Sequence, residues 1–360
     1  MPHTRTTCIY CKKYRQAKLI STFTMIEVQA IMQILFALAV STTKIEDTLS
    51  DEFINLINSK QNSWKAGRNF PVNTPLTYIK NLIGAMEDEN FAKLPKMTHN
   101  AELIANLPEA FDPREKWPHC PSLNEIKDQG ACSSCWAVAA AEVMTDRYCI
   151  FTNGKSKFQF SAHDLLSCCP DCGKGCHGGI PTKAWEYWRD YGIVSGGNYH
   201  SGEGCRPYEI PPCEHNVPGD LPPCGPKVTT PECIKACVSS YNNKSYPLDK
   251  RHGRTVYTLP PDEDQIKAEL FLNGPVESTI ATYEDFIHYK QGVYIHTDGS
   301  RSGVHSVKIL GWGVEGDQKY WLVANSWNPH WGDNGYFKIL RGENHCEIES
   351  HVVAGEPLII

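Results

Sequence analysis

The fold is decided by the stretch Gln129-Gly130-Ala131-Cys132-Ser133-Ser134-Cys135-Trp136-Ala137. The following residues, up to Met144, are rich in alanine and hold no glycine or proline, so a helix is predicted to begin near Cys135. Ser133 and Ser134 are candidate N-cap residues. A thiol at a helix N-terminus lies near unpaired backbone N–H groups and the positive end of the helix dipole, which both favour the thiolate. Cys135 is therefore a candidate nucleophile; the alternative is a buried or disulfide-bonded cysteine.

Composition excludes some classes of function and suggests a compartment. The chain of 360 residues has a formal net charge of −6, so no basic surface indicates a nucleic-acid partner. It holds 24 prolines and 27 glycines, which predicts a loop-rich fold. Of its 16 cysteines, 14 lie between Cys120 and Cys346, which indicates folding in an oxidising compartment of the secretory pathway.

Three regions follow one another along the chain. Residues 1–43 are interpreted as an N-terminal extension and signal peptide, because the largely apolar run at 30–40 is too short to span a bilayer; a buried helix is the alternative. Residues 44–106 contain no cysteine, predict helices at Ile45–Ser59 and Leu76–Glu89, and are interpreted as a pro-segment. A change of composition at 107–112 then begins a mature domain, 107–360, and no other hydrophobic run suits a membrane span.

The mature region predicts helices first and strands later. Helices are expected at 133–149 and 181–191, and loops in the cysteine- and proline-rich part 205–240. The last hundred residues contain runs typical of strands, at Ser306–Gly313, Tyr320–Asn325 and Gly335–Leu340. This order predicts an α+β protein with two packed halves.

A cysteine nucleophile needs a base, a group that orients the base, and donors for an oxyanion. His305 precedes a predicted strand and is the candidate base; the alternative is a surface or packing histidine. Asn325 ends another strand, where its amide can orient the imidazole and Trp327 can shield that bond; the alternative is a turn residue. Gln129 is the candidate oxyanion donor, beside the backbone N–H of Cys135, or else a solvated loop residue.

Together these residues resemble the papain family of cysteine peptidases. The family signature Cys-Gly-[Ser/Ala]-Cys-[Trp/Tyr] is matched by Cys132–Trp136, with Ser133 in place of glycine. The resemblance is strongest to the cathepsin B group of that family and extends from about residue 60 to 357. It is carried by these stretches: Trp64–Phe70, Gly204–Tyr208, Pro211–His215, Asn273–Glu277 and Tyr320–Gly342.

The resemblance implies a papain-like two-lobed fold, with a helical left lobe, a β-barrel-like right lobe and the active-site cleft between them. It adds a pro-segment and an occluding loop at about 205–237. It implies a zymogen that hydrolyses peptide bonds through a Cys135–His305 thiolate–imidazolium pair, with no cofactor and no metal. Peptide and protein substrates, protein inhibitors of the cystatin type, a monomer, and a lysosomal or extracellular location such as a gut lumen are also implied.

Several subsites are implied in the same way. Gly178 and Gly179 match the site that holds the substrate backbone. His215-Asn216 matches a histidine pair that binds the substrate's C-terminal carboxylate, and Asp128 matches the aspartate that tethers it. A neutral amide forms weaker hydrogen bonds with a carboxylate than an imidazolium does, so weakened dipeptidyl carboxypeptidase activity is expected beside endopeptidase activity. His351 replaces a glutamate on the S2 floor and Val304 replaces a glycine, so less P2 arginine and more apolar P2 residues are expected.

The cysteines fit the same resemblance. The implied disulfides are Cys120–Cys149, Cys132–Cys176, Cys168–Cys233, Cys169–Cys172, Cys205–Cys237 and Cys213–Cys224. A zinc site at Cys168, Cys169, Cys172 and Cys176 is an alternative, although no His-x₃-His partner follows. Two other hypotheses for the whole chain are a non-catalytic binding protein on the same fold and a disulfide-rich structural module. The second does not explain why Cys135, His305 and Asn325 occur together.

Overall fold

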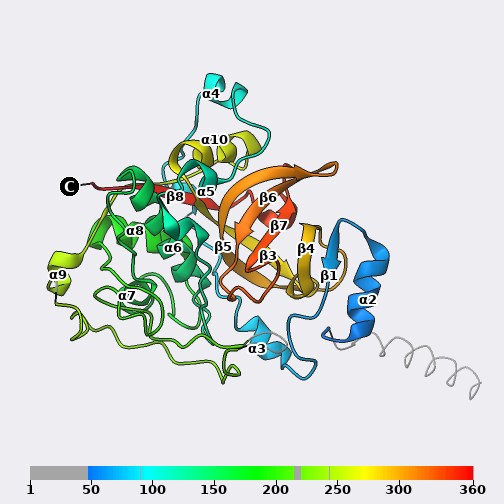
Figure 1. Cartoon of the computed structure of the whole chain (residues 1–360), viewed down its shortest axis with the longest axis horizontal. Coiled ribbons are helices and arrows are strands. Elements are labelled where there is room, and N and C mark those ends of the chain that lie inside the picture. Colours follow the sequence, from blue (N-terminus) through cyan, green and yellow to red (C-terminus); the bar gives the residue numbers. More distant parts are fainter. Residues whose placement is uncertain (1–47, 90, 215–219, 243, 360) are drawn as a thin grey trace, which may run out of the picture. The chain divides into compact units, whose positions relative to one another are not determined.

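The computed structural model describes residues 48–89, 91–214, 220–242 and 244–359 (Figure 1). The expected signal peptide at 1–43 lies outside these residues, and so do His215 and Asn216. Within the described ranges, no helix has the length and apolar character needed to cross a membrane.

One half of the molecule is built from helices (Figure 1). Its three main helices are α6 (Cys135–Phe151), α7 (Ala162–Cys168) and α8 (Pro181–Tyr191), which confirms the predicted helices at 133–149 and 181–191. Every residue of α6 from Cys135 to Cys149 is buried, which small alanine side chains allow at close helix contacts. These helices pack around a hydrophobic core of their own.

The N-cap prediction is correct in position but wrong in its hydrogen bond. Ser134 occupies the N-cap of α6, yet its hydroxyl does not cap the helix. It lies 2.7 Å from the Tyr208 hydroxyl instead, because α6 begins inside the protein, where a tertiary partner is in reach.

The other half is an eight-stranded, mostly antiparallel sheet with strand order β1-β4-β7-β6-β5-β3-β8-β2. The strands are β1 (Trp64–Ala66), β2 (Gly253–Thr258), β3 (Val276–Tyr283), β4 (Tyr289–Tyr294), β5 (Arg301–Glu315), β6 (Gln318–Ala324), β7 (Tyr336–Leu340) and β8 (Val352–Pro357). The three predicted strands are confirmed as parts of β5, β6 and β7. The predicted α+β fold with two packed halves is therefore confirmed, since each half has its own core.

Six further helices and four 3-10 turns complete the described part of the fold. They are α2 (Asp51–Lys60), α3 (Leu76–Lys80), α4 (Ala101–Ala105), α5 (Pro113–Lys116), α9 (Tyr246–Asp249) and α10 (Glu263–Asn273), with 3-10 turns η1 (Phe91–Lys93), η2 (Pro121–Asn124), η3 (Phe286–His288) and η4 (His345–Glu347). The described residues between 205 and 240 form neither helix nor strand, as predicted.

The expected pro-segment follows the predictions only in part. The helix predicted at Ile45–Ser59 is confirmed only in part. Helix α2 ends one residue later than predicted, at Lys60, but residues 48–50 precede it as a turn, and Ser50 Oγ caps it by accepting a hydrogen bond from Phe53 N–H. The helix predicted at Leu76–Glu89 is confirmed at its start but wrong in its length, because α3 begins at Leu76 and ends at Lys80. Beyond Lys80 the backbone N–H groups of Ala85 and Met86 bond to the mature region, so tertiary hydrogen bonds replace the helical ones.

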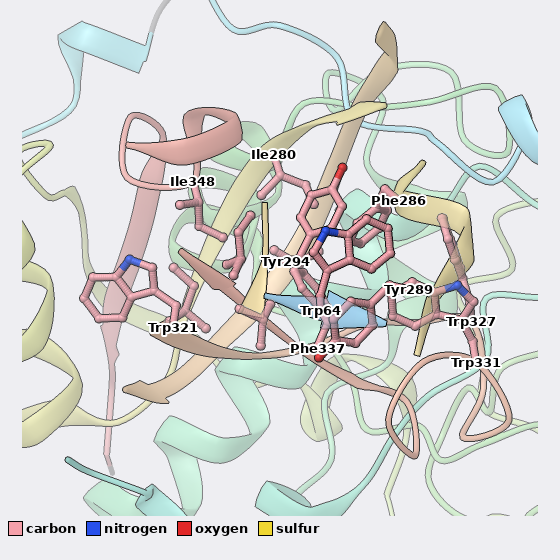
Figure 2. Close-up of a cluster of buried hydrophobic side chains, with 14 of the residues drawn as sticks. Trp64, Ile280, Phe286, Tyr289, Tyr294, Trp321, Trp327, Trp331, Phe337 and Ile348 are labelled. Atoms are coloured by element: carbon pink, nitrogen blue, oxygen red, sulfur yellow. The ribbon is translucent and has the colours of Figure 1, made fainter. Parts of the chain in front are cut away.

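The expected pro-segment packs on the sheet half through aromatic side chains. Strand β1 pairs with β4 at the edge of the sheet, and Trp64 enters the aromatic cluster around Tyr289 and Tyr294 (Figure 2). Phe70 is fully buried, with its ring centroid 6.2 Å from that of Trp327. Between them, Asn69 Nδ2 donates to the backbone carbonyls of Ile287 and Tyr289, at 2.9 and 2.7 Å.

Six disulfides cross-link the mature region, and they are the six pairs that the resemblance implied. The pairs are Cys120–Cys149, Cys132–Cys176, Cys168–Cys233, Cys169–Cys172, Cys205–Cys237 and Cys213–Cys224. The zinc interpretation of Cys168, Cys169, Cys172 and Cys176 is wrong, because disulfide sulfurs carry no thiolate to bind the metal. Among the described cysteines, Cys135 and Cys346 are free.

The aromatic anchor can be tested by a stability measurement. Replacing a buried phenylalanine with alanine costs about 3–5 kcal/mol, so Phe70→Ala should lower the urea midpoint of the full chain markedly. Val72→Ala is the matched control, because Val72 is 51% exposed and its truncation should change the midpoint little. Equal midpoints for the two variants would contradict this account of how the segment is held.

Candidate active site

The expected nucleophile, base and orienting residue come from both halves. Cys135 is the first residue of α6, whereas His305 lies within β5 and Asn325 directly follows β6. His305 is thus inside its strand rather than before it, paired in register with Ile280 of β3. The structure brings the imidazole to Asn325, with His305 Nε2 2.8 Å from Asn325 Oδ1. This contact requires a proton on Nε2 of the neutral ring, since a carbonyl-type oxygen only accepts.

Trp327 covers this pair. Its ring centroid lies 4.9 Å from that of His305, and both side chains are fully buried. His305 Nδ1 makes no hydrogen bond with any residue that the structure describes. The free nitrogen is the one that Asn325 leaves available for proton transfer.

Burial holds both reactive groups in their neutral forms. It raises the pKa of the Cys135 thiol to about 11, against the opposing effect of backbone N–H groups of Ser306 and Gly84. It lowers the pKa of His305 to about 4, although the bond to Asn325 acts in the other direction. Both shifts favour the neutral forms, thiol and imidazole, over thiolate and imidazolium.

Gln129 is held in place by a residue that the sequence did not indicate. Ser326 Oγ donates to Gln129 Oε1 at 2.8 Å, which fixes the amide with its Nε2 pointing away. Gln129 Nε2 then donates to the carbonyls of Cys132, at 2.7 Å, and of Leu82, at 2.9 Å. The expected oxyanion donor therefore already holds a peptide carbonyl, supplied by the chain's own N-terminal segment.

The N-terminal segment continues past the Cys135 sulfur through residues 84–86. Gly84 N–H donates to Cys135 Sγ, with the two atoms 3.2 Å apart. Gly179 N–H donates to the Gly84 carbonyl at 2.9 Å, and Met86 N–H donates to the Gly179 carbonyl at 2.8 Å. Ala85 N–H donates to the Val304 carbonyl at 3.1 Å. Gly179 and Val304, two of the expected subsite residues, thus bind an extended peptide between the halves, in a parallel bridge with Ala85.

Three glycines make this approach possible. A Cβ atom on Gly84 would overlap the Ser133 carbonyl, and one on Gly179 would overlap the Trp136 ring. Gly178 has a φ of +105°, a conformation that residues with a side chain rarely adopt. The absence of side chains at these positions lets two backbones lie against the nucleophile.

Ser133, the departure from the family signature, has a visible partner. Its hydroxyl donates to the carbonyl of Asn81 in the expected pro-segment. Its backbone is not among those with positive φ, so the serine is accommodated without a left-handed conformation.

A cavity of about 270 Å³ adjoins this peptide and contains both expected S2 residues. Val304 and His351 line it, together with Glu347 of the mature region and Met86 and Phe91 of the N-terminal segment. The Phe91 ring meets the His351 ring edge-on, with centroids 5.0 Å apart. The sequence pattern does not indicate Glu347 as a lining residue. It reaches this cavity through the turn η4, where its φ is +64°.

The described parts of the expected occluding loop are attached beside this site. Asp128 Oδ2 accepts from Cys213 N–H at 3.2 Å and from Asn328 Nδ2 at 3.3 Å. Glu214 Oε2 lies 3.1 Å from His330 Nδ1. The position of Asp128 at the root of the loop is compatible with the tethering role expected for it, whose partner His215 lies outside the described residues. No cluster of described residues is arranged to hold a metal ion.

Alkylation tests the protonation state of Cys135. At pH 7 a thiol with a pKa of about 11 is ionised in roughly one molecule in ten thousand, so iodoacetamide should modify Cys135 of the intact chain very slowly. The rate should rise about tenfold per pH unit up to that pKa. After removal of the N-terminal segment, the rate at pH 7 should increase by orders of magnitude, as followed by mass spectrometry.

Cys346 provides the internal control. Burial raises its pKa to about 12, with Asp285 and Glu347 acting in the same direction, so its alkylation in the intact chain should also be slow. Rapid alkylation of Cys135 at pH 7 in the intact chain would contradict the effect of burial described here.

Comparison with known proteins agrees with this geometry. Residues 107–356 match the family model "Papain family cysteine protease", and residues 49–89 match "Peptidase family C1 propeptide". The chain is 44% identical over 314 residues to a cathepsin B-like cysteine proteinase of Schistosoma japonicum, which covers 86% of this chain and 91% of that protein. It is 42% identical over 320 residues to cathepsin B-like cysteine proteinase 6 of Caenorhabditis elegans, which covers 85% of this chain and 83% of that one.

A solved structure is similar as well. The procathepsin B S9 of Trypanosoma congolense superposes with a TM-score of 0.76 at 39% identity, covering 87% of this chain and 100% of that one. The family model alone spans more than half of the chain. The chain therefore belongs to the papain family of cysteine proteases, as a cathepsin B-like member made as a proenzyme.

Proposed function

We propose that the mature enzyme is an endopeptidase that cleaves peptide bonds through Cys135 and His305. The observation that carries the proposal is the peptide already lying in the cleft. Leu82 offers its carbonyl to Gln129, and Gly84 and Met86 form backbone hydrogen bonds with Gly179. A cleft that binds an extended peptide by its backbone, beside a cysteine and an oriented histidine, supports peptide hydrolysis.

The proposed reaction begins when the pro-segment leaves. Water then reaches Cys135 and His305, so the effect of burial on both pKa values decreases and the thiol proton moves to His305 Nδ1. The thiolate attacks the scissile carbonyl carbon, and the oxyanion receives hydrogen bonds from Gln129 Nε2 and the Cys135 backbone N–H. His305 returns its proton to the leaving amine, and an acyl-enzyme remains. Water, deprotonated by His305, hydrolyses the thioester and releases the acid.

The same contacts support a zymogen that leaves its own segment uncut in this position. The group that meets the sulfur is the Gly84 N–H, not a carbonyl carbon. The carbonyl held by Gln129 belongs to Leu82, two residues earlier. The segment therefore contacts the candidate nucleophile through the Gly84 N–H and the candidate oxyanion donor through the Leu82 carbonyl.

The boundary between pro-segment and mature domain is proposed at about residue 106. Most of residues 101–110 are exposed, including the short helix α4, so a protease has access to them. Upstream of this region the chain is fastened again, since Met97 N–H donates to the Thr258 carbonyl at 2.9 Å and His99 Nε2 lies 2.8 Å from Glu269 Oε2.

We also propose a secretory route ending in a lysosome or outside the cell. Six disulfides, which persist in oxidising compartments, support this route. A monomer that meets protein inhibitors of the cystatin type is proposed from the family resemblance.

The mechanism predicts a graded set of losses. Cys135→Ala should abolish turnover of a peptide substrate by the processed enzyme, because no nucleophile remains. Gln129→Ala should retain acylation but lower kcat by roughly 10²–10³-fold, the usual cost of one oxyanion donor. Both are measured with a fluorogenic peptide after the pro-segment has been removed.

Active-site titration with a covalent thiol inhibitor supplies the control. Gln129→Ala should still bind the inhibitor in stoichiometric amount, which would show that the site is folded. Wild-type turnover by Cys135→Ala would exclude the mechanism, and a wild-type protein inert to both substrate and inhibitor would favour the non-catalytic alternative.

The S2 cavity predicts a preference at P2. His351 and Val304 line it, and the one carboxylate of the mature region beside them, Glu347, is 49% exposed and lies 4.0 Å from Arg301. An exposed and already paired carboxylate binds arginine weakly, so apolar P2 residues should exceed P2 arginine. His351→Glu should raise the ratio of kcat/KM for P2 arginine over P2 phenylalanine about tenfold or more.

Glu347→Gln is the matched variant. It removes a carboxylate from the same cavity and should change this ratio little. Two results would contradict the predicted apolar preference at P2. One is a wild-type enzyme that strongly prefers P2 arginine, and the other is a Glu347→Gln variant in which the ratio of kcat/KM for P2 arginine over P2 phenylalanine falls markedly.

Carboxypeptidase activity is proposed to be present but weak. His215 is the expected binder of the substrate's C-terminal carboxylate, and Asn216 stands where the family has a second histidine. Asn216→His should increase cleavage of free-acid peptides relative to their amidated counterparts, because a charge-assisted hydrogen bond is roughly twice as strong as a neutral one. The unchanged rate on an internally quenched, doubly blocked peptide serves as the control. An unchanged free-acid preference would remove the idea.

A further inference from the structure

The N-terminal segment leaves the contacts with Gly179 and Val304 as an acidic run, Glu87-Asp88-Glu89. All three residues border the S2 cavity. The mature walls of this cavity come from the N-terminus of α8 in the helical half and from β3, β5 and β8 in the sheet half. The partners of these carboxylates therefore show which charge the outer part of the cleft accepts.

Asp88 is bound by the first turn of α8. Thr182, the second residue of this helix, donates from Oγ1 to Asp88 Oδ2. Thr182 is only 3% exposed, so its hydroxyl has a fixed place in the wall. The first turn of α8 contains no acidic residue, and its N-cap residue, Ile180, offers no side-chain acceptor to the first N–H groups. The segment thus supplies the negative charge that is favoured at this helix end.

Lys183 adds a positive charge beside Thr182. Its Nζ lies 2.6 Å from Glu186 Oε2. The hydrogen bond with Glu186 raises the pKa of Lys183, and the charge of Asp88 acts in the same direction. Lys183 therefore attracts a carboxylate at Thr182 in addition to its partner within the helix.

Glu87 meets a cation of the sheet half. Its Oε1 lies 3.8 Å from Nη2 of Arg301, the first residue of β5, which is also the strand of Val304 and His305. Arg301 Nη2 lies 4.0 Å from Glu347 Oε2 as well. A guanidinium carries five N–H donors, so Arg301 can hold a second carboxylate beside Glu347.

The acidic run lies where a substrate would have its P3 residue. Gly84 contacts Cys135 and Ala85 pairs with Gly179, so residues 87–88 follow on the side of that pairing away from the sulfur. A substrate cleaved by Cys135 places P1 beside the sulfur and P2 beside Gly179, with the P2 side chain in the S2 cavity. The next residue of the substrate then reaches the place that residues 87–88 occupy in the zymogen.

We propose that the mature enzyme selects substrates with an acidic residue at P3, bound by Thr182 and Lys183 on one side of the cleft and by Arg301 on the other. The inference rests on the proposed peptidase function and specifies its substrate class. When the segment leaves, these three residues lose the carboxylates of Glu87 and Asp88. A P3 glutamate or aspartate supplies a carboxylate to the same donors.

The test compares three acetylated fluorogenic tripeptides with the same P1 residue and phenylalanine at P2. They carry glutamate, glutamine or lysine at P3. With the processed enzyme, kcat/KM should be about three- to tenfold higher for the glutamate peptide than for the glutamine peptide and lowest for the lysine peptide, because partly exposed charge pairs contribute modestly. The difference should lie mainly in KM, since P3 is remote from the reacting atoms, and it should shrink in about 0.5 M salt.

Variants assign the preference to named residues. Lys183→Met and Arg301→Met should each lower the ratio of kcat/KM for glutamate over glutamine, and the double variant should bring it close to one. Lys319→Met is the matched control, because Lys319 is 58% exposed and lies opposite Val314 near the other end of β5. Titration with a covalent thiol inhibitor gives the concentration of folded enzyme for each variant, and the comparison of peptides on the wild type stands without any variant.

The possible failures are distinguishable. Equal kcat/KM for the glutamate and glutamine peptides would overturn the proposal and leave the peptidase function intact, and the contacts of Glu87 and Asp88 would then serve the segment alone. A glutamate preference that persists in the folded double variant would overturn the assignment to Lys183 and Arg301. An enzyme that cleaves none of the three peptides would contradict the proposed function itself, and this inference with it.

Discussion

The candidate active site depends on the contact between α6 and β5. Cys135 begins the helix and His305 lies in the strand, so neither half contains the pair by itself. The same two elements are joined by a buried ion pair, because Lys308, three residues beyond His305, lies 3.0 Å from Asp146 in α6. Removing one partner of a buried pair typically costs about 3–5 kcal/mol, since the other charge stays buried without compensation. The buried Lys308–Asp146 pair therefore restricts movement of α6 relative to β5, and with it the positions of Cys135 and His305.

Arg147, the next residue of α6, bonds the helix to α10, to β8 and to the backbone just before β3. It donates to Glu269 of α10 at 2.7 Å, to the Gly355 carbonyl of β8 at 3.1 Å and to the Pro275 carbonyl at 2.7 Å. All of these partners are distant in sequence. The position of Cys135 is therefore set by contacts made a turn or more along its own helix, and not only by the residues around the thiol.

The sequence predicted the parts of this arrangement that are local. An alanine-rich run without glycine or proline is enough to indicate α6, and alternating β-branched and aromatic residues are enough for β5, β6 and β7. Residues 81–89 were assigned to a helix because their pattern is compatible with one, yet their backbone donors bond to Val304 and Gly179, which no local pattern reveals. Helix α10 and strand β3 were not predicted either.

The candidate site is likewise predictable from the sequence only in part. Cys135, His305, Asn325 and Gln129 were recognisable from a family signature and its order along the chain. Ser326, which orients Gln129, stands next to Asn325 in the resembling stretch Tyr320–Gly342, but its role depends on a hydrogen bond across 197 residues. Glu347 lines the cavity beside Val304 and His351 because η4 turns with a positive φ, and the residue types in that turn do not predict this conformation. Contacts of this kind come from the packed structure and not from the pattern.

The fit of the N-terminal segment over Cys135 depends on the absence of a side chain at Gly84. A single methyl group at this position would meet the Ser133 carbonyl and push the segment away from the thiol. The clash concerns the form that still carries this segment, since residue 84 lies in the stretch that matches the family propeptide. A substitution at residue 84 would therefore be expected to alter how the segment lies over Cys135 without changing any residue of the peptidase stretch 107–356.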